Sequence, residues 1–294
     1  MKQAGKVRIG VSGWRYAPWR GVFYPAKLPQ KQELAYCAQV FSTVEINGSF
    51  FSLQTPTSYR RWSEETPEDY VFAVKGSRYI THMLKLRNVE IALANFFASG
   101  LLALGPKLGP ILWQLPPNFI FRPEVLESFF KLLPRTMQQA ADLGTGHDAK
   151  LRGRAFVEPE ADGPVRHAME IRHRSFVCEE FIVLLRKYRI ALVCADAVEW
   201  PLLMDVTADF VYCRLHGSEV LYASGYDAQA LDKWAERVVA WATGGEAEGE
   251  RASSVLGPKQ ERDVYVYFDN DAKVRAPFDA QGLRERVEKL RLSD

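Results

Sequence analysis

Seven short apolar segments of this sequence carry acidic, basic or amide side chains close to where each segment ends. The set comprises Ser12, Glu45, Lys75, Gln114, Glu170, Arg172, Asp196, Arg214 and His216. Arginine holds phosphate or carboxylate oxygens as a planar fork, and lysine holds them as a point charge. Carboxylates accept protons, and histidine changes charge near neutral pH. These residue types together favour acid–base or hydrolytic chemistry on an anion.

The first hypothesis is therefore an enzyme of the hydrolase, lyase or isomerase type, acting on a small substrate that bears phosphate or carboxylate. Its anion would be held by Lys75, Arg172 and Arg214. The candidate catalytic residues are Glu45, Glu170, Asp196 and His216, with a glutamate as base and the histidine as proton shuttle. For His216 the alternative is a buried histidine that bonds a carbonyl, although Gly217 after it permits a close backbone approach.

A divalent metal is a weaker alternative for the same residues. Glu45, Glu170, Asp196 and His216 are of the types that bind Mg²⁺, Mn²⁺ or Zn²⁺ in barrel enzymes. Lys75, Arg172 and Arg214 are expected beside these carboxylates and would already neutralise them. The sequence also has no HExxH or clustered His/Cys spacing. We therefore assign no metal ligands, and the cofactor requirement stays open.

Aromatic residues near the first predicted strand suggest a second class of function. Trp14 and Tyr16 could form a stacking wall for a sugar or a base. With Lys75, Arg78 and His82, this wall also suits the end of a single-stranded nucleic acid. The net charge of +2, from 38 Lys and Arg against 36 Asp and Glu, lacks the basic excess typical of nucleic-acid-binding surfaces. Nucleic-acid binding or processing is the second hypothesis, and a non-catalytic ligand sensor is the third.

The elements that must position these residues alternate along the chain. Apolar runs typical of buried strands alternate with amphipathic segments such as 228–242, which indicates βα units and a parallel sheet. The predicted strands are 8–14, 43–47, 70–76, 109–116, 167–173, 191–197, 210–217 and 263–271. Eight units in 294 residues, without a Gly-rich nucleotide loop, predict a single-domain (β/α)₈ barrel rather than an open doubly wound sheet.

Alternation along these strands predicts which side chains enter the barrel. In 210–217 the apolar face belongs to Val211, Cys213 and Leu215, which must meet the helices. The same reasoning predicts that the following side chains point into the barrel: Ser12, Trp14, Glu45, Asn47, Lys75, Gln114, Glu170, Arg172, Asp196, Arg214 and His216. Only for the strand 263–271 does alternation leave open which face points inward. Because an unpaired buried charge costs several kcal/mol, the carboxylates should pair with the cations. The sequence predicts a polar pocket at the mouth of the barrel, and an ion-pair network that only sets strand register is the alternative.

Two polar, glycine-bearing segments, about 135–166 and 244–261, follow predicted helices, so we expect surface insertions at the N-terminal face of the barrel.

The four cysteines have no CxxC spacing, the N-terminus has no signal-peptide apolar region, and no run reaches the ~18 apolar residues of a spanning helix. We expect a cytoplasmic protein without a membrane partner. The oligomeric state is not indicated.

Seven blocks in this order resemble the YecE-like family, known as domain of unknown function seventy-two. The blocks are VSGWRYAPWRGVFYP, FSTVEINGSFFSL, FAVKGSRYITH, GPILWQLPPNF, MEIRHRSF, YCRLHG and YVYFDNDAKVRAP. The resemblance implies a TIM-barrel-like fold in a bacterial or archaeal cytosolic protein, and it implies no established reaction.

Two blocks depart from the family pattern. The family-typical FNND stands here as Phe268, Asp269, Asn270 and Asp271, so a carboxylate replaces the first amide. By this resemblance, Asn270 is a candidate substrate-binding residue. The family-typical FRHPSW stands at 171–176, with Arg174 in place of proline and Phe176 in place of tryptophan.

Overall fold

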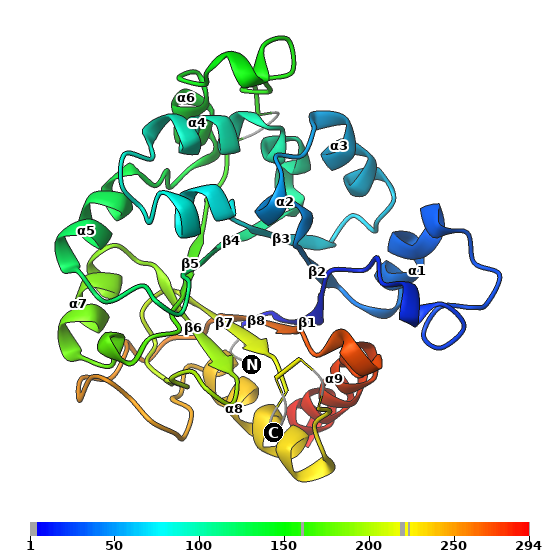
Figure 1. Ribbon diagram of the computed structural model, residues 1–294. Coiled ribbons are helices and arrows are strands. Elements are labelled where there is room, and N and C mark those ends of the chain that lie inside the picture. Colours follow the sequence, from blue (N-terminus) through cyan, green and yellow to red (C-terminus); the bar gives the residue numbers. More distant parts are fainter. Residues whose placement is uncertain (1–4, 160–161, 218–220, 223, 294) are drawn as a thin grey trace.

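Eight parallel strands form the centre of the protein and follow one another around a closed barrel (Figure 1). They are β1 Val7–Ser12, β2 Thr43–Ile46, β3 Val71–Lys75, β4 Leu108–Gln114, β5 His167–Glu170, β6 Ala191–Asp196, β7 Phe210–Leu215 and β8 Asp263–Phe268. β1 pairs with β8 as well as β2, with Val11 opposite both Phe268 and Val44. This computed structural model describes residues 5–159, 162–217, 221–222 and 224–293. The predicted (β/α)₈ barrel is confirmed.

Helices surround the barrel and occupy most of the connections between strands (Figure 1). They are α1 Glu33–Val40, α2 Gly48–Phe51, α3 Pro56–Glu64, α4 Glu90–Ala98, α5 Pro123–Leu132, α6 Met137–Gly144, α7 Glu179–Lys187, α8 Ala228–Ala242 and α9 Ala276–Ser293, with a π-helical turn at Tyr79–Met83 after β3. None of the helices in the described residues has both the length and the apolar character needed to cross a bilayer.

The amphipathic helix predicted at 228–242 is present as α8. Asp227 caps it, since its carboxylate accepts a hydrogen bond from the Ala230 N–H at 2.8 Å. The predicted apolar stripe is buried and consists of Leu231, Trp234, Ala235, Val238 and Val239. α8 packs beside α9 on the outer surface of the barrel (Figure 1).

The connection from β6 to β7, residues 197–209, contains no helix. The polar segment 244–261 covers part of it instead. The Asp205 carboxylate accepts hydrogen bonds from the Ala252 and Ser253 N–H groups, at 2.8 and 3.1 Å. The other polar segment, 135–166, includes α6, which packs against α4. Both segments therefore contribute to the outer layer that supports the barrel.

The interior of the barrel is filled asymmetrically. Tyrosines on β7 and β8, among them Tyr212 and Tyr267 with ring centroids 5.1 Å apart, occupy the space that alanines on β3, β5 and β6 leave open. On β6 the inner residues are Ala191, Val193 and Ala195. Leu192 and Cys194 belong to the core between the barrel and its helices. The predicted phase of β6 is therefore inverted.

The inward position predicted for Asp196 is wrong for this reason. Its Oδ2 atom accepts a hydrogen bond from the Trp234 Nε1–H of α8 at 2.9 Å. Both faces of β6 are apolar, so alternation alone does not decide which face meets the helices. The larger side chain of Leu192 fills the helix layer, while alanine fits the narrow interior.

Candidate functional site

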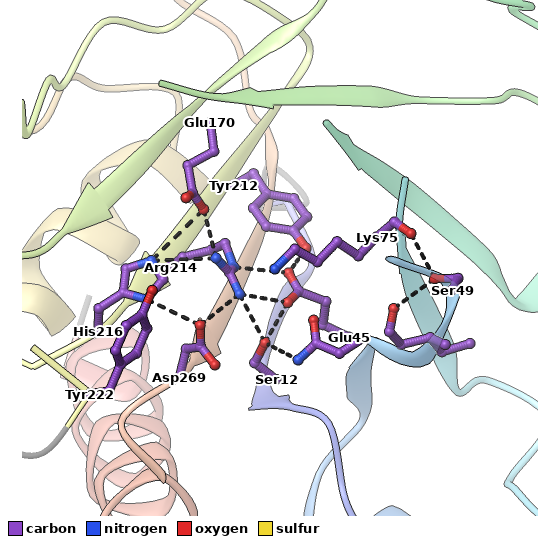
Figure 2. Close-up of polar contacts among 12 residues, drawn as sticks. Ser12, Glu45, Ser49, Lys75, Glu170, Tyr212, Arg214, His216, Tyr222 and Asp269 are labelled. Atoms are coloured by element: carbon purple, nitrogen blue, oxygen red, sulfur yellow. Dashed lines mark hydrogen bonds and ion pairs between the residues drawn. The ribbon is translucent and has the colours of Figure 1, made fainter. Parts of the chain in front are cut away.

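Arg214, near the C-terminal end of β7, is the centre of a buried polar ring (Figure 2). Its Nη1 donates to Glu170 Oε2 at 2.7 Å, and its Nε donates to Glu45 Oε2 at 3.1 Å. Its Nη2 lies 2.9 Å from Glu45 Oε1, 2.8 Å from Asp269 Oδ2 and 3.0 Å from Ser12 Oγ. All three nitrogens of this fully buried side chain are engaged within the protein. This geometry favours Arg214 as the group that positions the carboxylates, rather than as the anion ligand that the sequence suggested.

Glu45, at the inner face of β2, receives further donors from β1 and, across the barrel, from β7. The Tyr212 hydroxyl donates to its Oε2 at 2.6 Å, and the Ser12 hydroxyl donates to its Oε1. Asn47 extends the network, because its Nδ2 donates to Ser12 Oγ at 2.9 Å. Glu45 is fully buried and fully bonded.

Glu170, at the end of β5, is held by two arginines. Arg172 Nε donates to its Oε1 at 2.8 Å, while Arg214 bonds its other oxygen. Burial alone would raise the pKa of Glu170, but the two guanidinium groups and His216 hold it well below the ordinary value. Glu170 therefore stays ionised, as expected, but its low basicity makes it a poor proton acceptor.

Arg172 lies at the rim of the ring. Its guanidinium carbon is 3.6 Å from the centroid of the Trp200 ring, a cation–π contact that orients the plane of the group. Nη2 is 2.8 Å from Glu170 Oε1 and 3.5 Å from the Tyr222 hydroxyl. Within the described residues Nη1 has no hydrogen-bond partner, and the side chain keeps 10% of its surface exposed. Arg172 therefore retains a donor for a ligand.

His216 is fully buried between two carboxylates. Its Nδ1 lies 3.1 Å from Asp269 Oδ2, and its Nε2 lies 3.8 Å from Glu170 Oε2. Burial would raise the pKa of Asp269, but Arg214, His216 and Lys75 lower it to about 2. The following residue, Gly217, has a φ of 107°, which favours glycine. Asp269 and Arg214 thus orient the imidazole from both sides.

Lys75, at the end of β3, enters the same site but forms no hydrogen bond through its ammonium group to any described residue. Its Nζ instead lies 4.4 Å from the centroid of the Phe50 ring. Burial and the like charge of Arg214 lower its pKa to about 8. The Ser49 hydroxyl donates to the Lys75 carbonyl oxygen at 2.6 Å, which fixes the end of the strand (Figure 2).

His82, in the π-helical turn after β3, shares the Phe50 ring with Lys75. The His82 and Phe50 ring centroids are 5.1 Å apart, edge to face. Its Nδ1 lies 2.8 Å from the Thr81 hydroxyl. Burial, followed by the charges of Arg172, Lys75 and Arg78, lowers the pKa of His82 to about 4. His82 is therefore neutral at physiological pH and is surrounded by cations.

Asp271, which follows β8, is a further titratable group with a strongly shifted pKa. Burial and the nearby charge of Asp269 raise its pKa well above the ordinary range, and the Tyr16 hydroxyl acts in the opposite direction. Tyr16 itself donates its hydroxyl to the Ser12 carbonyl oxygen. This environment favours the protonated form of the Asp271 carboxyl group over the carboxylate.

The described residues contain no group of three or more His, Cys, Asp and Glu side chains arranged to hold a metal ion. The Arg214 guanidinium occupies the space between Glu45, Glu170 and Asp269, where a cation would bind. Asp196 is directed to α8 and does not join them. The ligand set considered for a divalent metal therefore does not fit one in this arrangement.

The barrel brings together most of the residues singled out in the sequence. Those in or next to the ring are Ser12, Glu45, Asn47, Lys75, His82, Glu170, Arg172, Arg214 and His216. Gln114 is buried at the end of β4, where it pairs in register with Glu170. Asn270 is not in the ring, because its Nδ2 donates to Asp279 Oδ2 and to the Ser224 carbonyl oxygen. Its assignment to substrate binding is not supported by this position.

Trp14 and Tyr16 line a separate cavity of about 280 Å³ beside the ring, together with Asn47 and Phe51. Trp14 does not point into the barrel as predicted, because its ring packs edge-on against Trp62 of α3 with centroids 5.3 Å apart. The chain turns at the end of β1, so strand alternation no longer applies there.

The residues of the site that were not among the sequence candidates include Asp269, Tyr212, Tyr222 and Trp200. Tyr212 has the same inward phase as Arg214 and could have been included on that ground. Asp269 occupies the position where a carboxylate replaces an amide, which was the available signal. Trp200 and Tyr222 come from irregular connections, where alternation gives no signal.

The model of the family described as "Protein of unknown function DUF72" matches residues 8–293. UPF0759 protein YunF of Bacillus subtilis is 28% identical over 118 residues, which are 38% of this chain and 41% of YunF. UPF0759 protein YecE of Escherichia coli K12 is 28% identical over 113 residues, which are 38% of this chain and 39% of YecE. These alignments thus span about two fifths of the curated relatives.

Solved structures of two other proteins share the fold over nearly their whole length. A DUF72 family protein of Thermotoga maritima is 25% identical, with a TM-score of 0.73 over 96% of this chain and 99% of that one. One from Enterococcus faecalis is 16% identical, with a TM-score of 0.68 over 96% and 95% of the two chains. The resemblance seen in the seven sequence blocks is confirmed, and the chain belongs to the DUF72 family.

Proposed function

We propose that this protein is an enzyme that performs acid–base chemistry on a small anionic substrate at the mouth of its barrel. The observation that carries the proposal is the environment of His82. Burial lowers its pKa most, and the charges of Arg172, Lys75 and Arg78 lower it further. Cations that disfavour a charged histidine favour an anion at the same place.

In this proposal Arg172 binds the anion and Lys75 transfers the proton. Arg172 retains an unengaged Nη1 and is oriented by Trp200. Lys75 has a pKa of about 8, close to the pH at which a cellular enzyme works. Glu170 and His216, first considered as the acid–base pair, are fully buried and bonded to charged neighbours, so we assign them to positioning.

Binding of a phosphate-bearing ligand tests the anion site. Glycerol 3-phosphate, small sugar phosphates and nucleotides would be titrated by calorimetry, each with and without Mg²⁺. Arg172→Gln should weaken binding at least tenfold, because it removes a charged donor. Arg174→Gln, which alters an exposed arginine two residues along, is the matched control and should leave binding unchanged. Equal affinity in the Arg172→Gln variant and the unaltered protein would contradict the proposal.

A second candidate, the end of a single-stranded nucleic acid, is favoured by one observation outside the ring. Phe51 and Tyr79 leave 69% and 42% of their surfaces exposed around the mouth. Phe51 also lines the cavity that contains Trp14 and Tyr16. Exposed rings beside cations suit base stacking. Fluorescence anisotropy with a short labelled oligonucleotide tests this, and Phe51→Ala should weaken binding if bases stack there.

A further inference from the structure

We infer that Lys75 is a nucleophile that forms an imine with an aldehyde or ketone group of the substrate. The inference rests on the proposed function, because the anion site would bring the carbonyl compound to the mouth of the barrel. It adds the substrate class, a carbonyl compound that also bears an anionic group.

The surroundings of Lys75 favour a reactive amine. An imine-forming lysine needs a free lone pair on nitrogen, and therefore a neutral amine. Lys75 Nζ donates to no described acceptor, and its side chain is 8% exposed. Burial, followed by the like charge of Arg214, disfavours the ammonium form and outweighs the opposing effect of the carboxylates of Glu45, Asp269 and Glu170. With a pKa of about 8, about a quarter of Lys75 is neutral at pH 7.5, against about a thousandth of an ordinary lysine.

Lys107 provides an internal comparison, because it has the same small exposed fraction but is differently bonded. Its side chain is also 8% exposed. Its Nζ donates to the Thr66 carbonyl oxygen at 2.9 Å, to the Thr66 hydroxyl at 3.2 Å and to the Ser63 carbonyl oxygen. Three acceptors hold this ammonium group in place, so its role is structural. The absence of such acceptors distinguishes Lys75.

The proposed step balances without an oxidant or a reductant. The Lys75 amine nitrogen attacks the carbonyl carbon, and the C–O π pair moves to oxygen. One of the two amine protons moves from nitrogen to that oxygen through solvent, which gives a carbinolamine. The remaining N–H proton then moves to the hydroxyl group through solvent, the C–O bond breaks, and water leaves as the C=N bond forms. Hydrolysis reverses these steps and regenerates the amine.

Trapping by reduction tests the inference. The protein would be incubated with glyceraldehyde 3-phosphate or pyruvate and sodium cyanoborohydride, and its modified peptides identified by mass spectrometry. Lys75 should be labelled at least tenfold faster than Lys107 and the exposed Lys187, with a rate that rises around pH 8. Lys75→Arg should remove this label while circular dichroism confirms the fold. Labelling of Lys75 no faster than Lys187 would overturn the inference.

Two further probes separate failure of the inference from failure of the anion site. Glycerol 3-phosphate carries the anion without a carbonyl, and butanone carries a carbonyl without an anion. Binding of glycerol 3-phosphate without trapping of any carbonyl probe at Lys75 overturns the imine and leaves the proposed function intact. Trapping of butanone at Lys75 without binding of glycerol 3-phosphate supports the nucleophile and overturns the anion site.

Discussion

Replacement of Arg214 by methionine should destabilise the protein strongly. Methionine preserves much of the side-chain volume, so the main change is loss of charge from the centre of the ring. Glu45 and Asp269 would lose their principal counter-ion, and Glu170 would keep only Arg172. Removing one partner of a buried ion pair costs about 3–5 kcal/mol. With a urea m-value of about 3 kcal/mol/M, the unfolding midpoint should fall by about 1–1.7 M at pH 7.

The pH dependence of this loss identifies its cause. In the variant, buried carboxylates without a counter-ion have raised pKa values, so they take up protons as the pH falls and the unfavourable charge disappears. The difference in unfolding free energy between the variant and the unaltered protein should therefore be smaller at pH 5 than at pH 7.

Arg286→Met is the matched control for a surface ion pair. Arg286 Nε lies 2.7 Å from Asp232 Oδ1, but the two side chains are 29% and 62% exposed. This variant should lose no more than about 1 kcal/mol. An Arg214→Met variant with an unchanged midpoint, or with a loss equal at pH 5 and pH 7, would refute the reasoning from buried charge.

Three other predictions concern single groups. The pKa of Asp269 is lowered to about 2 in the folded protein, so its ionised carboxylate stabilises the folded state by about 2 kcal/mol above pH 4, and this stabilisation is lost as the pH falls towards 2. Asp269→Asn should therefore reduce the loss of thermal stability between pH 4 and pH 2. The pKa of Lys75 is lowered from 10.5 to about 8, so its charge destabilises the folded state fully below pH 8, progressively less between pH 8 and pH 10.5, and not above that pH. Lys75→Met should raise stability at pH 7 by up to about 3 kcal/mol in urea titrations, and a lower midpoint would contradict this. Asp196→Asn should leave ligand binding measured by calorimetry unchanged, because this side chain faces Trp234, and a large loss of affinity would mean that it reaches the site.

How far the sequence predicts the site depends on the strand. In β7, Val211, Cys213 and Leu215 alternate with polar or aromatic residues, and only one phase buries them against helices. The inward direction of Arg214 was therefore predictable. In β6 both faces are apolar, and the correct phase depends on the sizes of residues contributed by other strands. Asp196 was misplaced because that information lies outside its own segment.

Which side chains enter the ring was easier to predict than which of them form ion pairs with each other. The sequence supplies three inward cations, and nothing in strand alternation says which of them takes the central position. Arg214 contacts three carboxylates, whereas Lys75 contacts an aromatic ring and no described acceptor. The difference arises from strand register and side-chain reach, which only the closed barrel determines. The distinction between a positioning cation and a free amine therefore came from the structure.

The bonds of Arg214 also constrain how the chain acquires its structure during synthesis. Glu45 precedes its guanidinium partner by 169 residues, and Asp269 follows that partner by 55. A growing chain that has formed the first five strands carries Glu45 and Glu170 with no central counter-ion, so it cannot dehydrate them at low cost. The early strands must remain hydrated at that end until β7 has left the ribosome. The first half of this barrel is thus not expected to persist as a folded unit, and one late arginine makes completion of the barrel a cooperative event.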